Sequence, residues 1–223
     1  MEEYVKQNTM AYDSTAYEYD IKTNELRPQE IEKREYFLDL VKKGIKKDAK
    51  KAQDRRTAKK AAIIDIGCGP GRDAKIFSGK GFDVTGIDIS EEMLNRARTA
   101  APSARFSRMD FQKICLPDKS VDGAWFEAGI ICIQKDDAKT VLANIYRILK
   151  SGGILYISAK EGTTEGLEYD SRYNVNKFYA YYTEDELGAL LERCGFEIVK
   201  AKKIKIRSAY HKHRWINLFC RKP

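Results

Sequence analysis

Three glycines at alternate positions form a stretch in which a ligand could approach the main chain closely. The stretch reads IIDIGCGPGRDAKIF and covers residues 63–77. Gly67, Gly69 and Gly71 permit positive φ angles and leave no side chain between backbone and ligand. The apolar run before them predicts a buried strand, and the pattern after them predicts a helix. A glycine-rich loop between a strand and a helix is typical of a nucleotide or cofactor site.

Carboxylates end the next two predicted strands. Asp88 ends the run FDVTGID, where an acid can accept hydrogen bonds from both hydroxyls of a ribose. Asp110 ends the third strand and is followed by Phe111, a pair that suits the amino group and one face of an adenine. Three successive strand ends therefore offer a glycine loop, a ribose acceptor and an adenine acceptor.

The residues after the loop decide between kinds of nucleotide ligand. The spacing is GxGxG, whereas dinucleotide-binding folds use GxGxxG, and Arg72 and Asp73 follow directly. An acid at the start of a helix is unfavourable beside a pyrophosphate but tolerable beside a cationic ligand. The pattern therefore disfavours a nicotinamide or flavin dinucleotide.

The elements that must position these residues alternate between strands and helices. The sequence predicts five strands, each followed by a helix or loop, at 61–66, 82–90, 104–110, 120–128 and 152–160. Two further strands, 196–206 and 214–222, read as a hairpin. Thr183 and Glu186 form a capping-box pattern before a helix. Such alternation predicts an α/β fold, a parallel sheet with helices on both faces.

The chain is expected to be a single domain, because 223 residues suffice for one core. We expect an N-terminal arm at 1–27, a basic helical insertion at 42–60, a cofactor-binding core at 61–160 and a substrate-side segment at 161–223. The basic segment holds ten Lys or Arg and two Asp, which accounts for the whole net charge of +8. Five of these cations are spaced four residues apart, so a helix would gather them into a positive stripe: Lys43, Lys47, Lys51, Arg55 and Lys59.

Composition excludes several other classes of protein. No uncharged apolar run is long enough to cross a membrane, and the N-terminus lacks the layout of a signal peptide. Five cysteines without a CxxC spacing predict reduced core thiols in the cytoplasm. With only two histidines, the sequence predicts no metal site.

The motifs of residues 60–160 resemble those of the class I S-adenosylmethionine-dependent methyltransferases. DIGCGPG is similar to the family's first motif, GIDIS to the second, MDF to the third and VDGAWFEA to the fourth. The resemblance implies a Rossmann-like, doubly wound sheet of seven strands, mostly parallel, with the last strand antiparallel. It also implies S-adenosylmethionine as the cofactor.

The ends of the chain resemble a small-molecule subgroup of this family. Its N-terminal pattern Y-D-x-x-A-x-x-Y-D reads here as Tyr12, Asp13, Ala16, Tyr19 and Asp20. Its C-terminal patterns are similar to YYTEDEL at 181–187 and RWIN at 214–217. The resemblance implies an arm that folds over the cofactor as a lid, with Tyr19 nearest to it. The subgroup often has a His a few residues after the fourth strand, where this chain has Cys132.

The resemblance also assigns roles to individual residues. The glycine loop would line the methionine part of the cofactor, and Asp65 or Asp73 would face its ammonium group. Asp88 would hold the ribose, and Asp110 and Phe111 would hold the adenine. The full predicted cofactor set is Tyr19, Asp65, Gly67, Cys68, Gly69, Gly71, Asp73, Asp88, Ile89, Met93, Asp110, Phe111, Glu127 and Ala128.

The acceptor side is less defined by the sequence. Position alone suggests Glu127 or Tyr12 as an optional general base. Tyr12, Arg207, His211 and Arg214 are candidates for binding the substrate, since Arg suits an anionic group. The expected partner is a small molecule. The alternatives are an RNA methyltransferase that holds RNA on the basic segment and a cofactor-binding protein without catalysis; the oligomeric state stays open.

Overall fold

The computed structural model describes residues 2–23, 25–52, 60–205 and 214–223, and only the backbone of 46–52 and 204–205. Within these residues, seven strands form one sheet in the order β3-β2-β1-β4-β5-β9-β8. The strands are β1 (Ala62–Ile66), β2 (Asp83–Asp88), β3 (Arg105–Arg108), β4 (Val121–Phe126), β5 (Leu149–Lys160), β8 (Glu197–Lys205) and β9 (Arg214–Arg221). The first five are parallel, and β9 is antiparallel to β5 and β8. The predicted fold class is confirmed.

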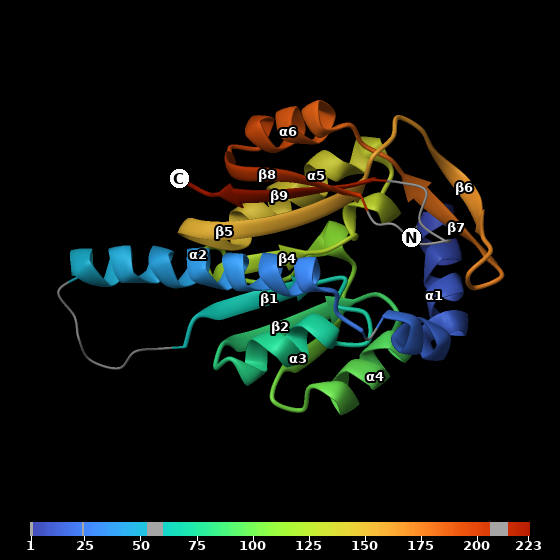
Figure 1. The fold of residues 1–223 in the computed structure, drawn as a ribbon, viewed down its shortest axis with the longest axis horizontal. Helices are drawn as coiled ribbons and strands as arrows, with labels where there is room; N and C mark the ends of the chain where they lie inside the picture. The colour runs from blue at the N-terminus through green and yellow to red at the C-terminus, as the bar shows by residue number, and fades with distance from the viewer. Residues whose placement is uncertain (1, 24, 53–59, 206–213) are drawn as a thin grey trace.

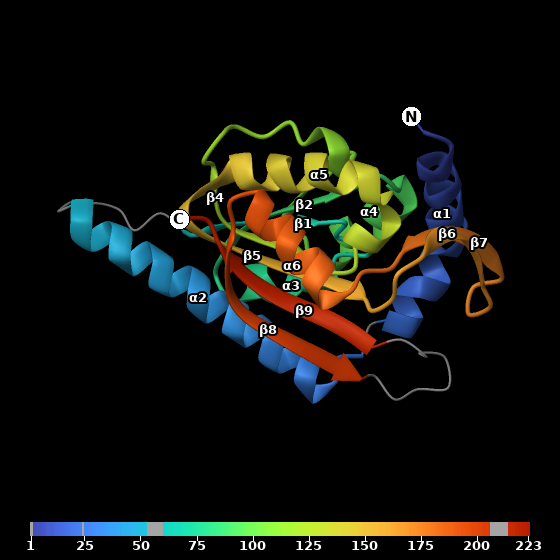
Figure 2. The same cartoon turned by 90° about the horizontal axis from the view of Figure 1, so that it is seen from above.

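Helices cover both faces of this sheet (Figures 1 and 2). They are α2 (Pro28–Ala52), α3 (Arg72–Gly79), α4 (Glu91–Ala100), α5 (Lys135–Ile148) and α6 (Glu184–Arg193). Phe37 of α2 and Phe77 of α3 pack against Trp125 on one face. Ile145 of α5 and Leu187 of α6 belong to the core of the other face. Because side chains alternate along a strand, each of the strands between these helices is buried on both sides.

The N-terminal segment is a helix, which the sequence analysis did not predict. Helix α1 (Glu3–Thr23) stands at the end of the sheet where the parallel strands finish (Figure 1). Its inner face carries Tyr4, Asn8, Tyr12 and Tyr19, whereas Met10 and Tyr17 on its outer face are 72% and 66% exposed. Since its apolar residues are few and its inner side chains are polar or aromatic, their helical spacing gives only a weak pattern.

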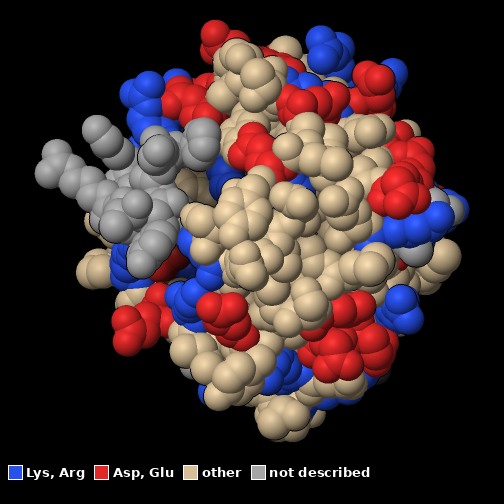
Figure 3. Space-filling model, turned by 90° about the vertical axis from the view of Figure 1, so that its right-hand side faces the viewer, with Lys and Arg blue, Asp and Glu red and all other residues tan. Residues whose placement is uncertain are grey.

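A second element absent from the sequence prediction is a two-stranded hairpin, β6 (Glu165–Asp170) and β7 (Val175–Ala180). It lies beside α1, and together they form the face shown in Figure 3, where uncharged residues fill the centre and carboxylates lie around it. The hairpin was missed because its strands, EGLEYD and VNKFYA, contain charged residues at positions that prove to be buried. Lys177 of β7 is only 1% exposed.

Other local predictions are confirmed, with one exception. Thr183 and Glu186 form the capping box of α6, with the Thr183 hydroxyl accepting from the Glu186 N–H. The five cysteines are free, but only Cys68 and Cys220 are buried and Cys115 is exposed, so the prediction of core thiols is wrong for Cys115. Much of the basic segment lies outside the described side chains, so the role predicted for its positive stripe stays a prediction. Across the described parts of the chain, no helix has the length and apolarity that crossing a bilayer requires.

Candidate functional site

A cavity of about 900 Å³ lies at the carboxyl ends of the parallel strands. Its floor comes from the residues that follow β1, β2 and β4, and its walls come from α1, the start of α2 and the β6–β7 hairpin. Two short 3₁₀ turns, η1 (Phe111–Lys113) and η2 (Ile130–Cys132), complete the wall. Open α/β sheets bind ligands at this edge, outside the carboxyl ends of the strands.

The glycine loop has the backbone conformation expected from its sequence. Gly67, Gly69 and Gly71 have φ angles of 67°, 51° and 83°, in the left-handed region that favours glycine. Gly67 and Gly69 line the cavity. Gly71 instead permits close packing of helices, because a Cβ there would lie 2.8 Å from the Cα of Ala97.

Asp88 lies at the end of β2 and faces the same cavity. Its Oδ2 accepts from the Gly69 N–H and its Oδ1 from the Ser90 N–H, both at 2.9 Å. Burial raises its pKa, while these hydrogen bonds oppose the rise. A carboxylate oxygen has more than one lone pair, so each oxygen of Asp88 can accept a further bond from a ligand hydroxyl.

Asp110 and Phe111, which the sequence analysis assigned to adenine, also line the cavity. Asp110 accepts from the Gln112 N–H at 2.9 Å and so fixes the η1 turn. Phe111 lies against Phe126 with a ring-centroid separation of 5.6 Å. Ile89 and Met93 line the same cavity.

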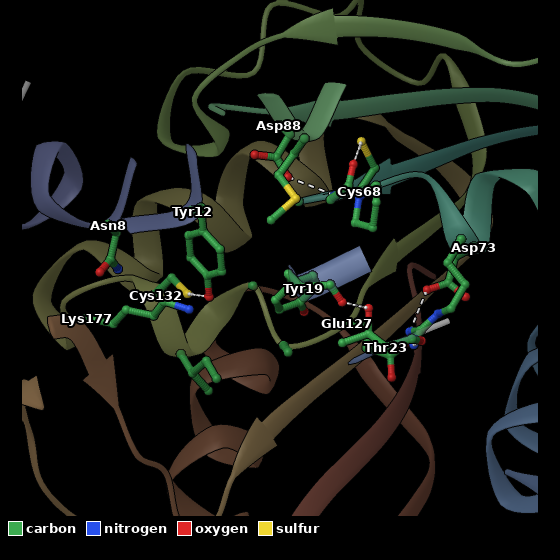
Figure 4. Close-up of a pocket in the computed structure, with 18 of the residues that line it drawn as sticks. Asn8, Tyr12, Tyr19, Thr23, Cys68, Asp73, Asp88, Glu127, Cys132 and Lys177 are labelled. Carbon is green, nitrogen blue, oxygen red and sulfur yellow. Dashed lines mark hydrogen bonds and ion pairs between the residues drawn. The ribbon is translucent and has the colours of Figure 1, made fainter. Parts of the chain in front are cut away.

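A group of buried charged side chains lies on the side of the cavity away from Lys177 and Cys132. Figure 4 shows Glu127 and Asp73 there. Glu127 forms ion pairs with Lys33, with Arg34 at 3.0 Å and with Arg72 at 3.3 Å. Arg34, which is 1% exposed, also pairs with Asp73. Burial alone would raise the pKa of Glu127, but the three cations hold it well below its usual range.

Two buried polar atoms beside this group have no hydrogen-bond partner among the described residues. They are Oδ2 of Asp65 and Nε of Arg72, and both residues line the cavity. Burial raises the pKa of Asp65 well above its usual value, and the nearby carboxylates of Asp73 and Glu127 raise it further. Buried polar groups almost always have hydrogen-bond partners. An unpaired carboxylate oxygen beside an unpaired guanidinium nitrogen therefore points to a ligand that carries a positive and a negative group.

The other end of the cavity is lined by lysines and tyrosines. Lys160 is 8% exposed and Lys177 is 1% exposed. Burial lowers the pKa of each lysine to about 8. The Tyr12 hydroxyl lies 3.4 Å from the Cys132 sulfur, and Figure 4 shows both beside Lys177. Burial raises the pKa of Tyr12 well above its usual value.

The structure brings nearly all predicted site residues together. Every member of the predicted cofactor set except Gly71 lines the cavity, as does Tyr12. Arg214 does not line it: its guanidinium pairs with Glu161 at 2.6 Å and is 59% exposed. Arg207 and His211 lie outside the described residues.

The sequence analysis missed several residues of the cavity wall. Lys33, Arg72, Lys160 and Lys177 were not selected, and neither was Arg34 behind the wall. No local pattern marks Lys33 and Arg34, because they meet Glu127 from more than 90 positions away along the chain. For Arg72 a signal existed, since it directly follows the third glycine of the loop.

Residues of the N-terminal pattern Y-D-x-x-A-x-x-Y-D hold helix α1 over the cavity. Tyr12 and Tyr19 are two turns apart and face the cavity. Asp13 accepts from the Ser90 hydroxyl, and Asp20 pairs with Arg96 at 2.9 Å, so both acids hold α1 on α4. On the other side, Asn8 accepts from the Phe178 N–H at 2.8 Å and donates to the Phe178 C=O at 3.2 Å.

Replacing Asn8 by Ala should lower the free energy of unfolding by about 1–3 kcal/mol, because two buried backbone groups of β7 lose their partners. Chemical denaturation would measure this loss, and hydrogen exchange should show faster exchange at the Phe178 amide. Asn95→Ala, on the exposed side of α4, is the matched control. Equal stability of the two variants would contradict the role assigned to Asn8.

Comparison with known proteins agrees with this geometry. Residues 63–153 match the family model described as a methyltransferase domain. This part of the chain is a methyltransferase domain. A solved S-adenosylmethionine-dependent methyltransferase from Methanosarcina mazei is 25% identical, with a TM-score of 0.66, and the match covers 74% of this chain and 94% of that one.

Curated relatives match a smaller share of the chain than this solved structure does. A malonyl-(acyl-carrier protein) O-methyltransferase from Hamiltonella defensa is 28% identical over 55% of this chain and 49% of its own length. A 2-methyl-6-phytyl-1,4-hydroquinone methyltransferase from a Synechocystis strain is 35% identical over 43% of this chain and 31% of its own length. The chain therefore spans half or less of the length of these relatives.

Proposed function

We propose that the chain binds S-adenosylmethionine and transfers its methyl group to a small-molecule acceptor by in-line displacement. The observation that carries this proposal is the pair of orphaned atoms beside the glycine loop, Asp65 Oδ2 and Arg72 Nε. The methionine end of this cofactor is a zwitterion. Its ammonium group matches the Asp65 carboxylate, and its carboxylate matches the Arg72 guanidinium. Asp73, the other sequence candidate for the ammonium, already pairs with Arg34 and Arg72.

The rest of the cavity fits the nucleoside. Asp88 would accept from the ribose hydroxyls, since each of its oxygens keeps a lone pair. Asp110 would accept from the adenine amino group, with the Phe111 ring against one face. When bound, the cofactor supplies a methyl group activated by its positive sulfonium. The protein then needs chiefly to orient the two reactants and to exclude water.

We further propose that α1 acts as the lid over the cofactor. Tyr12 and Tyr19 project from it into the cavity, and its ties to α4 and β7 hold it in place. Neither sequence candidate for a general base suits that task. Glu127 is held ionised by three cations, which makes it a weak base, and Tyr12 keeps its proton because burial raises its pKa. In this proposal Tyr12 orients the acceptor.

The test is calorimetric titration of S-adenosylmethionine and S-adenosylhomocysteine into the wild type and Asp88→Ala. We expect the substitution to weaken binding by roughly 10- to 100-fold, as for loss of charge-assisted hydrogen bonds. The matched control is Asp83→Ala, at the other end of β2, where the acid pairs with Arg105 at 2.7 Å outside the cavity. Failure of the folded wild type to bind either compound would overturn the proposal.

A further inference from the structure

We infer that the acceptor binds as an oxyanion, a carboxylate or phenolate on an apolar body, between the ammonium groups of Lys160 and Lys177. This inference rests on the proposed function and names the substrate class for the same cavity. Neither lysine was predicted from the sequence. One ends β5 and the other lies in β7, so only the fold places both on the cavity wall.

The two ammonium groups converge on one place in the cavity. Lys177 and Tyr179 lie on the same face of β7, and Lys160 Nζ lies 3.7 Å from the centroid of the Tyr179 ring. In agreement with this placement, the positive charges of both lysines oppose the rise that burial causes in the pKa of Cys132. Figure 4 shows the Lys177 side chain beside Cys132 and Tyr12. Asp73 lies at the opposite side of the same view. Since Arg72 accounts for the carboxylate of the cofactor, the lysines remain for a second molecule.

Among the described residues, carboxylates balance the positive charge of these two lysines only in part. Lys177 Nζ has its nearest carboxylate, Asp170, at 3.8 Å. That carboxylate already accepts two hydrogen bonds from Arg172, at 2.9 and 2.8 Å, and one from Tyr179. For Lys160 Nζ, no ion pair to a carboxylate is found within the described residues. Buried charges are normally paired, so an anion from the ligand would complete the site.

The side chains around the two lysines favour an anion whose remaining part is apolar. Lys177 Nζ lies 4.3 Å from the ring centroids of both Tyr12 and Tyr173, and Lys160 Nζ lies 3.7 Å from that of Tyr179. These rings, with Ile131 and Ile133, make up the nearby wall. Flat apolar walls favour a ligand that stacks on them while its charged group reaches the lysines.

An oxyanion also removes the need for a general base. Where the bound oxyanion is itself the nucleophile, its O–C bond forms as the C–S bond breaks, and the electron pair of that bond stays on sulfur. No proton has to leave the acceptor within the site. This agrees with the electrostatics of Glu127 and Tyr12, neither of which is suited to take a proton.

The experiment compares anions with their neutral counterparts on the complex of the protein with S-adenosylhomocysteine. The probes are benzoate against benzamide, and 4-nitrophenolate against 4-nitroanisole, titrated by calorimetry. We expect at least one anion to bind about tenfold or more tightly than its neutral counterpart. The preference should fall by on the order of 10- to 100-fold in Lys177→Met and Lys160→Met. The anion that binds more tightly identifies the class of oxyanion.

Controls separate this inference from the proposed function. S-adenosylhomocysteine should bind all variants as it binds the wild type. Lys75→Met, at an exposed lysine on α3, should keep the anion preference. Lys177→Arg should retain part of the preference for the anion. If Lys177→Met does not fold, Lys160→Met alone tests the inference. The inference is overturned if neither anion is preferred by the wild type, or if both methionine variants keep the preference. Absence of S-adenosylhomocysteine binding in the wild type would overturn the proposed function instead.

Discussion

Asp65→Asn is expected to weaken binding of S-adenosylmethionine by about 2–5 kcal/mol, roughly 30-fold or more, because a buried carboxylate loses its charge opposite the ligand ammonium. The same change should raise the melting temperature of the free protein near neutral pH. Without a ligand, the Asp65 carboxylate is buried and its Oδ2 has no partner among the described residues, so ionising it costs free energy. Opposite signs for affinity and stability would distinguish this residue from one that merely supports the fold.

The pH dependence of Asp65 follows from its raised pKa. An acid whose pKa is raised by folding contributes most to stability below its unfolded pKa, and that contribution is lost as the pH rises through the folded pKa. Cofactor binding favours the ionised form, so affinity should increase over the same rise in pH, with release of a proton.

Calorimetry in two buffers of different ionisation enthalpy measures that proton. We expect release by the wild type below the pKa of Asp65, and none from this position in Asp65→Asn. The control is Asp83→Asn, which should bind and melt like the wild type. If Asp65→Asn binds as tightly as the wild type, the ammonium lies elsewhere and Asp73 becomes the candidate.

Glu127→Gln should lower the free energy of unfolding by about 3–5 kcal/mol, because Lys33, Arg34 and Arg72 lose a shared buried carboxylate. For a chain of this length we expect a fall in melting temperature of about 10 °C. Calorimetric melting checks the prediction. Glu35→Gln is the matched control: its pair with Lys80 is exposed, so its loss should cost at most about 1 kcal/mol.

The sign of the pH effect is opposite for Glu127. Its folded pKa is lowered, so its contribution to stability is present above the unfolded pKa, about 4.3, and is lost as the pH falls further. The difference in melting temperature between wild type and Glu127→Gln should therefore be largest near neutral pH and should shrink in acid. A difference that stays constant down to acid pH would show that lost packing, rather than lost charge, destabilises the variant.

Local patterns in the sequence determined the sheet and the cofactor side of the site. Apolar runs bounded by glycines predicted the parallel strands, and the strand ends carried residues that line the cavity, as at Gly67, Asp88 and Asp110. Because parallel strands all end at one edge, residues known only by their position after a strand could be placed together. The antiparallel last strand could be foreseen from a family resemblance.

Only the tertiary structure decided the charge network and the acceptor side. Lys33, Arg34 and Arg72 meet Glu127 from as many as 94 positions away along the chain, and no periodicity encodes such a contact. Burial lowers the pKa of Lys160 and of Lys177. Lys177 lies in β7 against Tyr12 of α1, and Lys160 lies against Tyr179 of β7. The sequence analysis predicted neither α1 as a helix nor β6 and β7 as strands. Their inward side chains are polar and aromatic, so hydrophobic spacing could not reveal them. Burial and long-range pairing arise only when distant segments pack together.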